Sequence, residues 1–106
     1  GGDDFVVITT PSCAEAVSEA IVARFDAMAP RLYDEADRQR GYVLHADRKR
    51  QPVTLGFLTI SIAVVTNEEH PLTHFGQVAQ LGAELKAYAK QLERSVYVKE
   101  RRKPSA

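Results

Sequence analysis

Residues 59–65, Thr-Ile-Ser-Ile-Ala-Val-Val, are the stretch that decides the fold. They alternate at first between polar and apolar side chains and then become continuously apolar. Such a pattern is typical of a central strand that is covered on both faces. We predict one long strand over residues 53–66 around this stretch.

The segment before this strand predicts a first helix. Pro11 ends an apolar run, and Ser12 and Glu15 have the spacing of a capping box, with Ser12 as the N-cap. Pro30 lies within the periodic pattern, so the regular helix is expected to end or kink near Ala29. Apolar residues recur with nearly the helical period and define the face predicted to be buried: Val17, Ala20, Ile21, Phe25, Met28 and Leu32.

The segment after the central strand predicts a second helix and a final strand. Thr73 is the expected N-cap, and residues 96–98, Val-Tyr-Val, read as a short strand. The face of the second helix that we expect to be buried comprises Phe75, Val78, Leu81, Gly82, Leu85, Ala89 and Leu92.

Two further strands are predicted nearer the N-terminus. Phe5–Thr10 is an apolar run with strand character, and residues 42–45 form a second one after the charged connector 34–41. The polar run 47–51 is expected to be the tip of a hairpin that leads into the central strand. We interpret residues 33–52 as an insertion, which either docks a partner or is a solvated hairpin.

The predicted element order is therefore β-α-β-β-α-β. It indicates an α+β domain of the ferredoxin-like or palm type, with a central, mostly antiparallel sheet and two helices on one face. We assign residues 1–100 to this one domain and residues 101–106 to a polar tail, which matches the common domain size.

Composition excludes several classes of protein. Fourteen basic and fourteen acidic residues give no net charge, which does not favour binding to DNA or to a membrane surface. No apolar run approaches the ~20 residues that cross a bilayer. The single cysteine, Cys13, has no partner for an internal disulfide, in keeping with a reducing, cytoplasmic compartment.

The N-terminal residues Gly1-Gly2-Asp3-Asp4-Phe5 carry the chemistry. Glycines permit the backbone angles of a tight turn, and the turn presents two adjacent carboxylates. Adjacent carboxylates repel each other unless a hard cation such as Mg²⁺ or a shared proton offsets their charge. The pattern therefore suits nucleotide-phosphate chemistry, in which a metal bridges protein and phosphate oxygens. The alternative is an ordinary polar turn.

These five residues resemble the signature of the GGDEF family, the diguanylate cyclases that condense two GTP molecules into cyclic di-GMP. Residues 59–65 resemble the late core strand of that family. Residues 85–90, Leu-Lys-Ala-Tyr-Ala-Lys, are similar to its late helix, which ends in Ala-Lys. The three motifs occur in the family's order and cover most of the chain. The resemblance implies a bacterial, cytoplasmic signalling protein with an attached sensor or receiver domain and activity as a homodimer.

The resemblance also implies roles for individual residues. Asp3 and Asp4 would bind Mg²⁺, with Asp4 at the catalytic centre. Gly1 and Gly2 would let guanine and phosphate approach the backbone. Lys90 matches the family's phosphate-binding lysine, and Lys86 lies one turn earlier on the same side of the helix; both are candidates for nucleotide binding, with GTP as substrate or ligand.

Several features depart from the family's pattern. Asp4 stands where the family has Glu, Ala63 where it commonly has Gly, and Ala87 where it has Tyr. The family's fold also has a segment before the signature, with a third metal-binding carboxylate and a product-binding motif, so we interpret this chain as the C-terminal part of a GGDEF-like domain. The isolated chain is expected to be inactive. The alternatives are a degenerate, non-catalytic module that senses a nucleotide or docks a protein, and a palm specific for ATP or nucleic acid.

Overall fold

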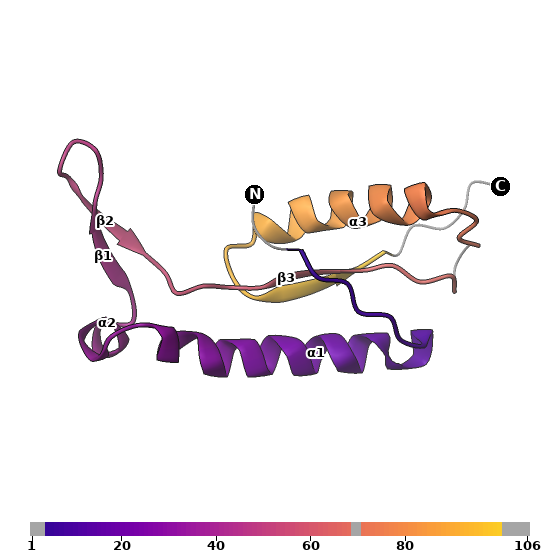
Figure 1. Ribbon diagram of the computed structural model, residues 1–106, viewed down its shortest axis with the longest axis horizontal. Coiled ribbons are helices and arrows are strands. Elements are labelled where there is room, and N and C mark those ends of the chain that lie inside the picture. Colours follow the sequence, from indigo (N-terminus) through magenta and orange to yellow (C-terminus); the bar gives the residue numbers. More distant parts are fainter. Residues whose placement is uncertain (1–3, 69–70, 101–106) are drawn as a thin grey trace.

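A computed structural model describes residues 4–68 and 71–100 of the chain. Over these residues the protein is a mixed α+β structure with two small sheets (Figure 1). The elements in chain order are α1 (Pro11–Met28), the 3-10 helix η1 (Ala29–Leu32), α2 (Glu35–Arg40), β1 (Val43–Ala46), β2 (Pro52–Leu55), β3 (Ser61–Val64), α3 (Phe75–Lys90) and β4 (Val96–Lys99).

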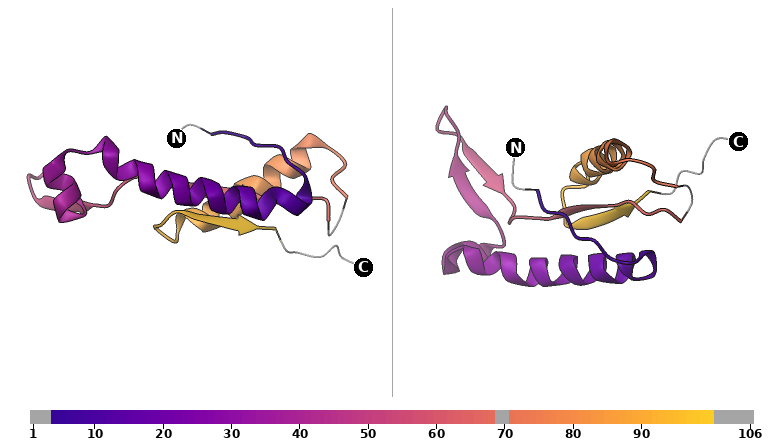
Figure 2. Two further views of the ribbon diagram at one scale, coloured as in Figure 1. Left: turned by 90° about the horizontal axis from the view of Figure 1, so that it is seen from below. Right: turned by 45° about the vertical axis from the view of Figure 1, so that its right-hand side comes forward.

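The central layer is the pair β3 and β4, which run parallel with Ser61 opposite Val96 and Val64 opposite Lys99. Helix α3 covers one face of this pair and α1 the other (Figures 1 and 2). The predicted mostly antiparallel sheet with both helices on one face is therefore wrong. A strand–helix–strand connection returns the chain in the same direction, which makes the pair parallel. Because β3 is apolar on both sides, each face needs its own helix.

The predicted strand Phe5–Thr10 is also wrong. These residues follow an extended path but belong to no strand, and the side chains of residues 5–8 are exposed. A strand needs a neighbour to pair its backbone groups, and the described part of the chain offers this segment none. Thr10 occupies the N-cap position of α1 with Pro11 next, so the helix begins before the predicted cap at Ser12.

The buried face of α1 differs from the predicted stripe. Ala14 and Ser18 are buried, and the Ser18 hydroxyl donates a 2.8 Å hydrogen bond to the Ala14 carbonyl. Val17, Ile21 and Phe25 of the predicted stripe are half-buried, whereas Ala20, Met28 and Leu32 are exposed. As predicted, the regular helix ends before Pro30, and the chain continues as η1.

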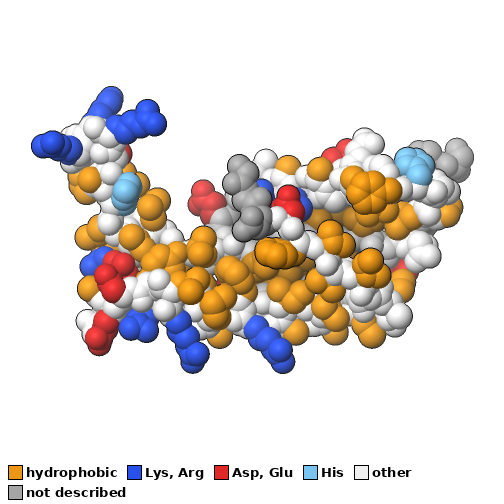
Figure 3. All heavy atoms as spheres, in the orientation of Figure 1, with side chains coloured by type: hydrophobic (Ala, Val, Ile, Leu, Met, Phe, Trp, Pro, Cys, Tyr) orange, Lys and Arg blue, Asp and Glu red, His pale blue; other side chains and the backbone are white. Residues whose placement is uncertain are grey.

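The antiparallel hairpin of β1 and β2 confirms the prediction for residues 42–53, with Val43 opposite Leu55 and Ala46 opposite Pro52. The carboxylate of Asp47 accepts 2.8 Å hydrogen bonds from the backbone N–H groups of Lys49 and Gln51, which shapes the turn. The hairpin projects from the helical body, and basic side chains gather at its end (Figures 1 and 3).

The long strand predicted over residues 53–66 is instead two strands, β2 and β3, separated by residues 56–60. Tyr33 contacts the residues between the two strands. Its ring stacks on Phe57 with 4.7 Å between the centroids, and its hydroxyl accepts a 3.1 Å hydrogen bond from the Leu58 N–H. These contacts involve Phe57 and Leu58, which lie between the hairpin and the central layer.

Helix α3 follows the predicted apolar stripe, except that Phe75 is exposed. Its N-cap is His74, whose Nδ1 accepts a 3.2 Å hydrogen bond from the Gln77 N–H. Thr73, the predicted cap, instead donates its N–H to the Gln77 side chain at 3.0 Å. Imidazole can serve as a cap because its neutral form carries one acceptor nitrogen.

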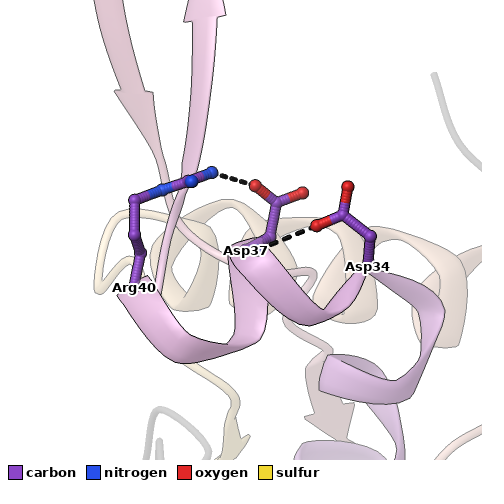
Figure 4. A network of polar contacts seen from close by, with 3 residues as sticks. All are labelled: Asp34, Asp37 and Arg40. Carbon is purple, nitrogen blue, oxygen red and sulfur yellow. Dashed lines mark hydrogen bonds and ion pairs between the residues drawn. The ribbon is translucent and has the colours of Figure 1, made fainter.

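The connector predicted over residues 34–41 contains a helix that the sequence reading missed. Asp34 caps α2 by accepting a 2.9 Å hydrogen bond from the Asp37 N–H, and Asp37 pairs with Arg40 (Figure 4). Gly41 ends the helix with a φ of 83°. Acidic residues in the first turn, basic residues in the last and a glycine directly after are the signals of a short helix. The helix therefore corrects the prediction of a charged connector over these residues.

Candidate functional site

The predicted site residues divide into two groups. Gly1, Gly2 and Asp3 lie outside the described residues. Asp4, Lys86 and Lys90 lie within them, where the N-terminal segment reaches the C-terminal end of α3 (Figure 1). The site that the structure describes is therefore one acid and two lysines.

Asp4 and Lys86 form an ion pair and hydrogen bond, with the Lys86 ammonium donating to the Asp4 carboxylate. The partners are 82 positions apart in the chain, so only the fold brings them together. The Asp4 side chain remains 74% exposed and that of Lys86 is 32% exposed. The pair is thus accessible to ligands and open to screening by salt.

The hydrogen bond from Lys86 lowers the pKa of Asp4 below its ordinary range, and the charge of Lys86 lowers it further. Lys90, one helical turn beyond Lys86, adds a smaller effect in the same direction. Lys90 also stands in the last turn of α3, where the helix dipole favours a cation.

Among the described residues, one carboxylate beside two ammonium groups gives the cluster an excess of positive charge. Such a cluster can attract an anion, and lysine is a common partner of phosphate groups. The exposed position of Lys90 leaves its ammonium group open to solvent. The arrangement therefore fits a phosphate better than it fits a cation.

The described residues do not fit a divalent metal ion. Within residues 4–68 and 71–100, no group of three His, Cys, Asp or Glu side chains lies close enough to hold one. Asp4 is the single predicted metal ligand among them, and it is already paired with Lys86. Because Mg²⁺ requires near-octahedral oxygen ligands, Asp4 alone does not make its site.

Cys13, considered above only for disulfide formation, places a free thiol at the start of a helix. It is exposed in the first turn of α1. Hydrogen bonding from Thr10, and then from Ser12, lowers the pKa of its thiol. A helix N-terminus also favours thiolate. The signal in the sequence was the position of Cys13 directly after Thr10, Pro11 and Ser12, at the start of a helix.

Comparison with known proteins yields no relative: no family model, no curated protein and no solved structure matches the chain. In the part of the chain that the structure describes, no helix combines the length and apolar character needed to cross a membrane.

Proposed function

We propose that this chain is a GGDEF-like signalling domain that binds the phosphates of a guanine nucleotide through Lys86 and Lys90, in the cluster that these lysines form with Asp4. The observation that supports the proposal is the contact between Asp4 and Lys86. Asp4 belongs to the N-terminal signature and Lys86 to the late-helix motif, and these two motifs resemble the same family independently. Their juxtaposition is what a shared nucleotide site requires.

In this proposal the lysines offset phosphate charge. Lys90 faces solvent at the end of α3 and would contact the terminal phosphates. Lys86 would exchange its bond with Asp4 for one with a phosphate oxygen, since both acceptors are anionic oxygens. Binding of this kind needs no rearrangement of α3, because the lysines are already on one side of the helix.

By resemblance, a domain of this kind would be a diguanylate cyclase, in which two GTP molecules meet across a homodimer. Asp3 and Asp4 would hold a Mg²⁺ ion, which would supply charge stabilisation for phosphoryl chemistry. The described residues do not make up a complete ligand set, so we expect the isolated chain to bind nucleotide without turning it over.

A second candidate is a degenerate module that senses a nucleotide or docks a protein without catalysis. The engagement of Asp4 by Lys86 favours it, because an acid held by a cation is a poor metal ligand. The replacement of the family's Glu by Asp4 supports the same reading. The two candidates differ in whether Mg²⁺ is needed for nucleotide binding.

Calorimetric titration with a non-hydrolysable GTP analogue, in MgCl₂ and separately in EDTA, tests both candidates. The Lys90→Ala variant should weaken binding by about 10-fold, the value of one charged hydrogen bond. Lys49→Ala, at the hairpin turn, is the matched control and should change nothing.

Three outcomes separate the readings. Binding that needs Mg²⁺ and is lost in the Asp3→Ala, Asp4→Ala double variant supports the cyclase-like site. Binding that persists in EDTA but is weakened in Lys90→Ala supports the non-catalytic sensor. No binding in either buffer would exclude the nucleotide site and leave only protein docking.

A further inference from the structure

The hairpin of β1 and β2 ends in three consecutive basic residues, Arg48, Lys49 and Arg50, which we call the basic tip. Their side chains are exposed and lie at the end of the hairpin that projects from the helical body (Figures 1 and 3). In the part of the chain that the structure describes, none of the three has an ion-pair partner. The neighbouring carboxylate of Asp47 accepts hydrogen bonds from the backbone instead. The tip therefore presents cations that no described side chain binds.

Arg50 occupies a backbone position that suits glycine. Its φ of 59° lies in the left-handed region, which a residue with a Cβ disfavours and glycine adopts freely. The Arg50 N–H donates a 3.0 Å hydrogen bond to the Asp47 carbonyl, so this conformation closes the turn. Residues held in such conformations cost stability and concentrate at functional sites. The backbone of Arg50 therefore points to a role for its guanidinium group.

The two strands behind the tip are largely apolar and carry no lysine or arginine. Residues 43–46 are Val-Leu-His-Ala, and residues 52–55 are Pro-Val-Thr-Leu. Six of these eight side chains are exposed, among them Leu44 at 54% and Leu55 at 46%. The hairpin is thus a projecting arm with apolar flanks and a cationic end.

This order of apolar and charged surface disfavours two kinds of partner. A ribbon in the groove of a nucleic-acid duplex has phosphates along both sides, so it needs basic side chains along its strands. Here the basic side chains are confined to the tip. A segment that enters a membrane interface places its apolar side chains deepest, with the basic ones behind them at the headgroups. The hairpin has the reverse order, with its charges outermost.

The outer edge of β1 fits a polypeptide. Among the described residues β1 pairs only with β2, and no other backbone hydrogen bond involves residues 43–46. This stretch contains no proline, lysine or acid that would block a further strand, whereas β2 begins at Pro52, which has no N–H to donate. An extended segment added to β1 would lie along the apolar flanks and end beside the basic tip.

We propose that the hairpin binds an extended polypeptide segment as a third strand beside β1. The segment is apolar along the strand and acidic at the end that lies beside Arg48, Lys49 and Arg50. Main-chain hydrogen bonds supply its affinity. Arginine pairs with carboxylates in a bidentate geometry, so the tip fixes the register of the segment and selects acidic sequences. This inference concerns a different surface from the proposed nucleotide site and does not rest on it.

Selection of phage-displayed random peptides on the full chain tests the proposal, with peptides of roughly ten residues, the upper length of a strand. The recovered sequences should be rich in apolar and β-branched residues and should carry Asp or Glu toward one end. Synthetic copies of them are then titrated by fluorescence anisotropy. Recovery of no peptide that depends on the hairpin would overturn the proposal.

Matched charge reversals locate the binding. The Arg48→Glu, Arg50→Glu variant should weaken peptide binding at least about 10-fold, the value of one charged hydrogen bond. The Arg24→Glu, Arg94→Glu variant makes the same change in net charge at two exposed arginines outside the hairpin, and it should leave the affinity unchanged. Equal effects of the two variants would refute a site at the tip.

Arg50→Gly separates the role of the side chain from that of the backbone. Glycine relieves the left-handed conformation, so the melting temperature should stay level or rise. Peptide affinity should nevertheless fall about 10-fold, because one cation beside the acidic residues is lost. Unchanged affinity, or loss of stability and affinity together, would overturn the role assigned to Arg50.

Vesicles that contain phosphatidylserine and a DNA duplex of random sequence are the competing probes, used at physiological salt. Neither should bind in a way that depends on Arg48 and Arg50. Vesicle or duplex binding that is lost in the Arg48→Glu, Arg50→Glu variant, without peptide binding, would contradict the proposal and assign the tip to that polyanion.

Discussion

The Ile60 N–H donates a 3.1 Å hydrogen bond to the hydroxyl of Ser95, and the next residue, Val96, donates its N–H to the Ile60 carbonyl at 3.0 Å. Ser95 is buried. The two bonds join the chain just before β3 to the chain just before β4, and so define where the parallel pair begins. A serine that the sequence presents as an ordinary loop residue is thus part of the central layer.

Replacing this serine should destabilise the protein. Ser95→Ala leaves the Ile60 N–H without its partner in a partly buried position, which costs about 1–3 kcal/mol of unfolding free energy. Urea denaturation followed by circular dichroism measures the change. Thr54→Ala, an exposed hydroxyl on β2, should stay within ~0.5 kcal/mol of the wild type. An equally small effect of Ser95→Ala would show that solvent replaces the hydroxyl.

The end of α2 depends on the backbone of Gly41. Its φ of 83° lies in the left-handed region, so Gly41→Ala should cost about 1–2 kcal/mol in backbone strain. Gly56→Ala is the matched control: a Cβ there meets no atom within 4 Å and its φ is not positive. Thermal unfolding should separate the two variants. Identical melting temperatures would mean that α2 frays without affecting the fold.

The Asp4–Lys86 pair predicts a dependence on pH. The folded-state pKa of Asp4 is lowered from its ordinary value of 3.8, mainly by the Lys86 hydrogen bond. The pair's contribution to stability is therefore fully present above pH 3.8 and is lost as the pH falls through the lowered folded pKa. Carbon-detected NMR titration of the Asp4 carboxyl follows this directly.

Variants of the two lysines check the cause of the shift. Lys86→Met should bring the midpoint of the Asp4 titration back up toward 3.8, because it removes both the hydrogen bond and the nearer charge. Lys90→Met should raise it less, since Lys90 acts through charge alone. The reverse order would place Asp4 against Lys90 in solution.

Cys13 should react faster with iodoacetamide at neutral pH than the same cysteine in the unfolded chain. The lowered pKa of its thiol, due first to Thr10, increases the fraction of thiolate, which is the nucleophile. Thr10→Val removes the main cause and should slow alkylation by about 2-fold or more. Mass spectrometry of quenched samples gives the rates. Equal rates for the folded wild type and Thr10→Val would show that the hydroxyl has no effect on the thiol.

Features that depend on local pattern could be predicted from the sequence. The apolar stripe of α3, the end of the regular helix before Pro30 and the hairpin around the turn at Asp47 follow from periodicity, proline and turn chemistry within a few residues. Helix α2 could equally be predicted, from Asp34 as its N-cap and Gly41 directly after its end. The predicted N-caps at Ser12 and Thr73 are wrong by two residues and by one residue, respectively. At a helix end, neighbouring residues compete for the cap position.

The sequence by itself determined which segments are helical, which residues turn the chain and which charged and acidic groups are available for chemistry. The tertiary structure alone decided that β3 and β4 are parallel, that α1 and α3 lie on opposite faces, that Asp4 meets Lys86, and that Phe5–Thr10 remains unpaired in the described chain. The reason is physical: a helix satisfies its backbone within one segment, whereas a strand and an ion pair each require a partner distant in the sequence, and only folding selects that partner.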